Sequence, residues 1–127
     1  MAYAVRMETT SSPKEAATMK HLITISHAFE GIINPILGDA AGYDGTEDTY
    51  LIRLAAVANA EWVKTTKAGV TIELDEDGLA VLREEAVYRV EWALDEAAGE
   101  YGGQQMAWFA TARSAKAMIA RIDKITA

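Results

Sequence analysis

The stretch that decides the fold runs from residue 70 to residue 99 and reads VTIELDEDGLAVLREEAVYRVEWALDEAAG. Its first five residues alternate apolar and polar side chains, which predicts a short strand over residues 70–74. Asp75 is a favourable N-cap, and the acidic residues that follow it stabilise the positive end of a helix dipole. Gly99 is placed to end the helix. The stretch therefore predicts a strand, a tight turn and one long helix over residues 76–98.

One face of this helix carries apolar residues at the spacing of a core-facing stripe. The stripe consists of Leu79, Leu82, Ala86, Val90, Ala93 and Ala97. The opposite face combines four carboxylates with two aromatic rings and a valine: Val81, Glu84, Glu85, Tyr88, Glu91, Trp92 and Asp95. Aromatic side chains are enriched in the buried centres of interfaces. Either another part of the chain covers this face, or it contacts a partner or a second copy.

The charge of the chain is unevenly distributed. Its 127 residues carry a formal net charge of -7, and residues 73–100 hold ten acidic and two basic side chains, a local net charge of -8. Binding to a nucleic-acid backbone requires a concentrated positive surface, so direct nucleic-acid binding is not expected. An acidic surface suits a basic partner, such as a protein that itself binds nucleic acid, although acidity also serves solubility.

Cysteine is absent, which excludes disulfides, thiol catalysis and cysteine-ligated metal sites. The first residues, MAYAVRMETTSS, lack the apolar run of a signal peptide, and no apolar segment has the length of a membrane span. We therefore expect a soluble cytoplasmic protein without membrane contact, located in the host cytoplasm if a phage encodes it.

Periodicity and capping residues predict the remaining elements. Residues 2–8 alternate weakly, which predicts a strand over about 3–8 that pairs with residues 70–74 as a two-stranded ribbon. Ser12, Pro13 and Glu15 form a capping box, which predicts a helix from there to Gly38. After a glycine- and aspartate-rich loop over residues 38–48, Thr46 is a plausible cap for a second helix that ends near Lys67.

A last helix is expected from about Gln104 to Thr126, with a buried stripe that includes Trp108, Ala112, Ala115, Ile119 and Ile122. The predicted fold is thus mainly α with a minor β part. It is a single domain over residues 1–127, in which four helices surround one core beside a short ribbon.

No motif indicates catalysis, a cofactor or a metal site. His21 and His27 project in different directions from one predicted helix, and His27 and Glu30 could hydrogen-bond. The loop at residues 38–48 lacks the regular oxygen ligands and closing glutamate of a calcium loop. Neither a di-iron Glu-x-x-His pair nor a nucleophile elbow, phosphate-binding loop or dinucleotide fingerprint occurs. We expect no metal, no cofactor and no enzymatic activity.

The leading functional prediction is a non-enzymatic protein-binding module, with Glu84, Glu85, Tyr88, Glu91, Trp92 and Asp95 as its contact residues. In size and composition the chain is similar to small acidic proteins of phages and mobile elements that block host nucleases or defence complexes. This similarity implies an inhibitor of a basic, nucleic-acid-binding host or defence protein. Two alternatives remain open: a structural, self-assembling homodimer, formed through the same face or the ribbon edge, and a small helical-bundle hydrolase.

Overall fold

The computed structural model describes residues 19–126, and it contains four helices and three strands within that range. They follow in the order β1 (His21–Ile25), α2 (His27–Ala41), α3 (Thr49–Ala58), β2 (Glu61–Thr66), β3 (Gly69–Leu74), α4 (Glu76–Ala98) and α5 (Gly102–Thr126). A mainly helical fold with a small antiparallel sheet is confirmed. The strand predicted over residues 3–8 and the capping box at residues 12–15 lie outside the described residues.

The predicted strand at residues 70–74 is confirmed as β3, the central strand of the sheet. The strand order is β1-β3-β2, and both neighbours run antiparallel to β3. The expected ribbon of two strands is therefore wrong in number, because β3 has a partner on each side. Alternate residues of the sheet, such as Ile23, Val70 and Ile72, are buried on the face that packs against the helices.

The helix predicted to reach Gly38 is wrong over residues 21–25, and the part of it before residue 19 lies outside the described residues. Residues 21–25 form β1, and the Ser26 hydroxyl caps α2 by accepting a hydrogen bond from the backbone N–H of Phe29 at 3.2 Å. The β-branched side chains of Ile23, Thr24 and Ile25 favour an extended strand when a neighbouring strand pairs with it. Helix α2 then continues past Gly38 to Ala41.

The helix predicted from residue 47 to residue 67 is also wrong in part, because it ends at Ala58. Asp48 caps α3 in place of Thr46, and its carboxylate accepts from the backbone N–H of Leu51 at 3.2 Å. Residues 61–66 form β2, whose six residues are all exposed. Strand pairing with β3 overrides the helical spacing of the apolar residues in this segment.

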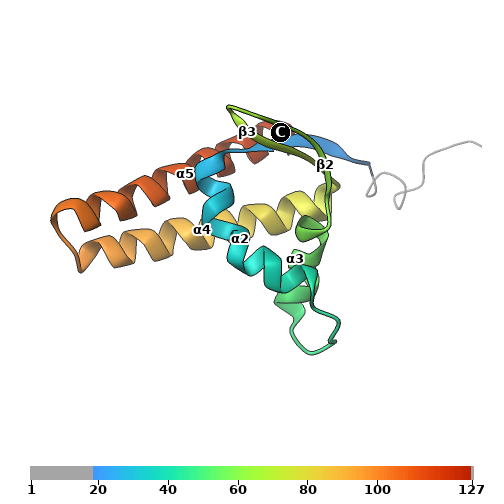
Figure 1. The fold of residues 1–127 in the computed structure, drawn as a ribbon, viewed down its shortest axis with the longest axis horizontal. Coiled ribbons are helices and arrows are strands. Elements are labelled where there is room, and N and C mark those ends of the chain that lie inside the picture. Colours follow the sequence, from blue (N-terminus) through green and yellow to red (C-terminus); the bar gives the residue numbers. More distant parts are fainter. Residues whose placement is uncertain (1–18, 127) are drawn as a thin grey trace, which may run out of the picture.

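Helix α4 has the predicted bounds. The Asp75 carboxylate accepts from the backbone N–H of Gly78 at 2.8 Å, and Gly99 follows the last helical residue. All of the predicted stripe is buried except Val90, which is half-buried against the same core. Helices α4 and α5 pack along each other as a hairpin that extends away from the sheet, with their connecting turn at the far end (Figure 1).

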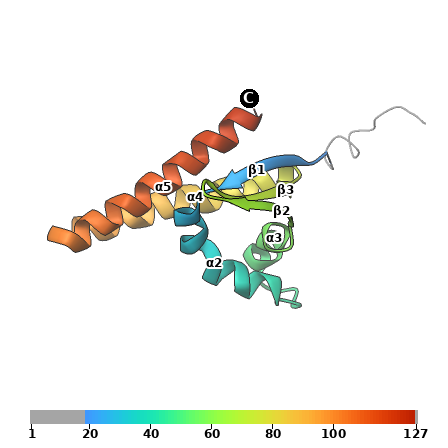
Figure 2. The ribbon, with the colours of Figure 1, turned by 45° about the horizontal axis from the view of Figure 1, so that its top comes forward.

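The sheet and α3 lie near the N-terminal half of α4, and α2 crosses the hairpin between this end and the turn (Figure 2). Side chains from the sheet and from all four helices form one buried cluster. Among the described residues, no helix has the length and apolar character that a membrane crossing requires. The arrangement leaves the outer side of α4 and a hollow beside α2 open to solvent.

Candidate functional site

The outer face of α4 is only partly exposed. Glu84, Tyr88, Glu91 and Asp95 point to solvent, and 53% of the Tyr88 surface is exposed. These four residues are separated by three or four positions, so they form one continuous row along the helix. We call this row the α4 acidic strip. The predicted face is thus covered by the chain in one part and open in another. The α4 acidic strip is the open part.

The other residues of the predicted face are covered by the chain itself. Val81 is buried, Glu85 is 1% exposed, and Trp92 is half-buried. The expectation that Glu85 belongs to an open contact surface is therefore wrong, because Glu85 lies on the side of α4 that faces the neighbouring helices. Its carboxylate accepts a hydrogen bond at 2.5 Å from Nε of Arg89, which is 17% exposed.

Two exposed ion pairs connect α4 to the helices beside it. Arg53 of α3 binds Glu84 through two hydrogen bonds of 2.9 and 2.6 Å, and Arg83 binds Asp123 of α5 through two of 2.7 and 3.1 Å. The hydrogen bonds from Arg53 hold the pKa of Glu84 below its ordinary value. Those from Arg83 do the same to the pKa of Asp123. Paired guanidinium donors stabilise the ionised carboxylate over the protonated one.

Replacing Arg53 with alanine is expected to raise the pKa of Glu84 toward that of a free glutamate. The lowered pKa means that Glu84 adds stability above its unfolded-state pKa, and that this contribution is lost as pH falls through the folded-state pKa. Carboxyl titration by NMR measures the change. Asp123 is the internal control, because its partner Arg83 is untouched and its pKa should stay lowered. An unchanged Glu84 titration in the variant would contradict the pairing.

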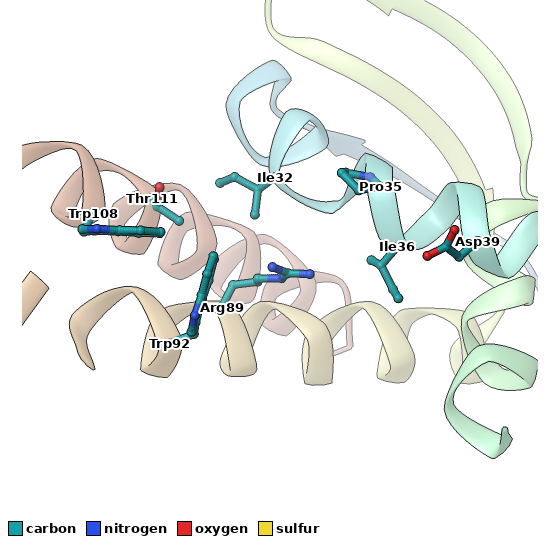
Figure 3. Close-up of a pocket in the computed structure, with 8 residues that line it drawn as sticks. All are labelled: Ile32, Pro35, Ile36, Asp39, Arg89, Trp92, Trp108 and Thr111. Carbon is teal, nitrogen blue, oxygen red and sulfur yellow. The ribbon is translucent and has the colours of Figure 1, made fainter. Parts of the chain in front are cut away.

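A cleft of about 470 Å³ opens beside the buried side of this face. Helix α2 supplies one wall, and α4 and α5 supply the other (Figure 3). The lining residues are Ile32, Pro35, Ile36, Asp39, Arg89, Trp92, Trp108 and Thr111. Clefts of this size and mostly apolar lining are common binding sites. Of the predicted contact residues, only Trp92 lines it.

Two tryptophans and Arg89 give the cleft a defined shape. The rings of Trp92 and Trp108 meet edge to face, with centroids 4.8 Å apart and planes at 76°. The Arg89 guanidinium carbon lies 5.3 Å from the centroid of Trp92 and 5.5 Å from that of Tyr88. These distances allow cation–π attraction on both rings. The Glu85 carboxylate accepts a hydrogen bond from Nε, so the hydrogen bond and the two aromatic rings together fix the guanidinium.

Polar atoms around the cleft are left unpaired. Glu85 Oε1 and Trp108 Nε1 are buried and have no hydrogen-bond partner within residues 19–126. Such atoms are uncommon in native proteins, and each costs free energy unless water or a ligand satisfies it. One signal for this cluster is present in the sequence, because Glu85 and Arg89 are spaced as an i,i+4 pair. The contribution of α2 depends on its crossing angle, which no local pattern encodes.

The two histidines do not converge on a common site. His27 Nε2 lies 2.6 Å from the carbonyl oxygen of Thr66. Its Nδ1 is 3.7 Å from the Glu30 carboxylate, which is within ion-pair range but too long for the expected hydrogen bond. His21 Nε2 is 3.7 Å from the Glu76 carboxylate. No group of three or more possible metal ligands occurs within the described range. Asp39 is the single carboxylate that lines the cleft.

Comparisons of the chain with protein-family models, with curated proteins and with solved structures find no match. The α4 acidic strip and the cleft are the features of the described structure that bear on function.

Proposed function

We propose that the protein is a non-enzymatic protein-binding module, and that the α4 acidic strip is its contact surface. The observation that carries this proposal is a half-exposed tyrosine set in a row of carboxylates. Tyr88 offers a large amphipathic area, and Glu91 and Asp95 beside it carry negative charge, whereas the charge of Glu84 is balanced by Arg53. No ion pair within residues 19–126 involves Glu91 or Asp95.

The partner that fits such a surface is basic. Carboxylates speed the encounter with a positively charged protein, and a central aromatic side chain contributes most of the affinity once water is excluded. Proteins that bind nucleic acid carry concentrated positive surfaces of this kind. The local charge of -8 over residues 73–100 favours one form of this function. The protein would inhibit a nucleic-acid-binding host or defence protein, and it would be encoded by a phage or mobile element and act in the host cytoplasm.

Tyr88 is the anchor to test, because Trp92 packs against Trp108 and its removal would disturb the hairpin. Tyr88→Ala is expected to weaken binding by about 2 kcal/mol or more, as for an interface hot spot. Tagged wild type and variant would capture proteins from a lysate of the source organism or its host. The dissociation constant of the captured partner would then be measured at two salt concentrations. Weaker wild-type binding at higher salt is expected, because the carboxylates are exposed.

The matched control is Tyr50→Ala, which removes another exposed tyrosine, on α3 and outside the strip. It should leave the affinity unchanged. Charge reversal by Glu91→Lys should slow association, since it removes the attraction that steers a basic partner. Equal loss of affinity in the Tyr50 and Tyr88 variants would contradict the strip as the contact surface.

Self-association is a second candidate function, and the edge of the sheet favours it. Strand β2 is exposed over its whole length, and Trp62 and Val63 remain largely open. An uncovered edge strand can pair with an edge from a second copy. Light scattering across a concentration series tests this candidate. A monomer mass at every concentration would remove it.

A further inference from the structure

The cleft between α2 and the α4–α5 hairpin holds two opposite charges on apolar walls (Figure 3). Arg89 reaches into it from α4, and Asp39 borders it from α2. The two side chains form no ion pair or hydrogen bond with each other in the described structure, so each can bind a separate group. Ile36 lies between them, and Ile32 and Trp92 line the cleft on the other side of the Arg89 guanidinium (Figure 3).

The guanidinium of Arg89 can donate further hydrogen bonds to a ligand. Within residues 19–126 its one hydrogen bond runs from Nε to Glu85, so the two terminal nitrogens are without an acceptor. A guanidinium presents paired donors that match a carboxylate. The buried Glu85 carboxylate and the cation–π contact with Trp92 fix its orientation before any ligand arrives. Pre-organisation of this kind lowers the entropic cost of binding.

The charges around the cleft select the ligand class. A simple anion would meet Arg89 but also the carboxylates of Glu85 and Asp39 and the overall charge of -7. A zwitterion is neutral overall, so it escapes that repulsion. Its carboxylate can bind Arg89 while its ammonium group binds Asp39. An apolar side chain would then cover Trp92 and the isoleucines of α2.

We propose that this cleft binds a small zwitterion with an apolar body, namely a free aromatic or branched-chain amino acid. The site adjoins the α4 acidic strip, because Arg89 contacts both Trp92 and Tyr88, but the proposal does not depend on the protein-binding function. The cleft volume of about 470 Å³ leaves room for one such molecule together with water. The ligand also shields the edge of the Trp92–Trp108 pair from solvent, which provides an optical signal.

Tryptophan fluorescence of the full chain tests the proposal. Trp62→Phe would first remove the one tryptophan outside the cleft, which is exposed on β2. The probes are phenylalanine and leucine, their N-acetyl derivatives and their methyl esters. Saturable changes with the free amino acids are expected, and derivatives that lack either charge should bind at least about tenfold more weakly, the loss expected when a charged group is left without its partner.

Two variants assign the charges to residues. Asp39 is exposed, and asparagine retains the shape of its side chain. The Asp39→Asn variant should therefore fold normally and lose the preference for ligands with a free ammonium group. Arg89→Lys keeps the charge but loses the paired donors, and it should weaken binding of the free amino acids. Arg113→Lys, on the exposed side of α5, is the matched control and should bind as wild type. Circular dichroism confirms that each variant is folded.

Three outcomes would overturn the proposal. The first is the absence of a saturable signal with any probe below about 10 mM. The second is methyl-ester binding as tight as that of the free amino acid, which would remove the role of Arg89. The third is equal binding of the N-acetyl derivative by wild type, which would remove the role of Asp39 and indicate the C-terminal residue of a peptide instead.

Discussion

Replacing Gly69 with alanine is expected to destabilise the protein by about 3 kcal/mol or more. Gly69 begins β3 with φ of 146°, a conformation that side chains other than glycine rarely adopt. A Cβ built there would overlap the carbonyl oxygen of Ile25 and lie 2.7 Å from the carbonyl carbon. Both atoms are backbone, so they cannot move aside without separating β1 from β3. Urea unfolding followed by circular dichroism measures the loss.

Gly31→Ala is the matched control, because it adds the same methyl group to a helical glycine. Gly31 lies in α2, is exposed, and has no atom within 4 Å of the built Cβ. This variant is expected to gain about 0.5–1 kcal/mol from the better helix propensity of alanine. Similar stabilities for the two variants would contradict the close approach of β3 to β1.

The α4 helix was predictable because its determinants are local. Asp75 caps it, Gly99 follows it, and the stripe that begins at Leu79 fixes its buried face. The two end signals lie next to the helix ends that they specify, and the stripe repeats at every turn. No knowledge of the tertiary fold is therefore required to find the helix. The strand at β3 was predictable for the same reason, since its alternating pattern is continuous over residues 70–74.

The strands β1 and β2 were missed because their sequences also fit a helical period. Leu22 and Ile25 continue the spacing of Phe29 and Ile33, although the chain changes from strand to helix at Ser26. In β2, Trp62 extended the stripe of α3 in the same way. What decides between strand and helix is pairing with β3, which is forty-odd residues from β1 in sequence but only a two-residue turn, residues 67–68, from β2. The pattern of apolar residues within β1 does not contain its long-range contact, and in β2 the helical spacing obscured a local hairpin.

The candidate site shows the same division between local and long-range information. Helical geometry placed Glu84, Tyr88, Glu91 and Asp95 together, and they do form one exposed row. Glu85 lies toward the side of that row that faces neighbouring helices, and the chain buries it. The cleft could not be predicted, because its α2 wall comes from a helix whose start was misplaced by the missing strand.

Removing the buried carboxylate of Glu85 is the second substitution expected to have a large effect. Glu85→Ala should destabilise the protein by about 3–5 kcal/mol, because it leaves the Arg89 side chain, which is 17% exposed, without its charged partner. The substitution also frees Arg89 from the hydrogen bond that orients it over Trp92. Equilibrium unfolding in urea measures the first effect, and tryptophan fluorescence of the folded state reports the second.

A double variant separates the cost of an unpaired charge from the cost of lost packing. Glu85→Leu combined with Arg89→Met replaces both charges with apolar side chains, and it should be near wild type in stability or up to about 4 kcal/mol more stable. If the double variant is as unstable as Glu85→Ala, the pair stabilises the fold and needs no functional explanation. If it is stable but no longer binds amino acids, the ion pair is retained for the cleft, because a carboxylate that adds little net stability then serves to orient Arg89.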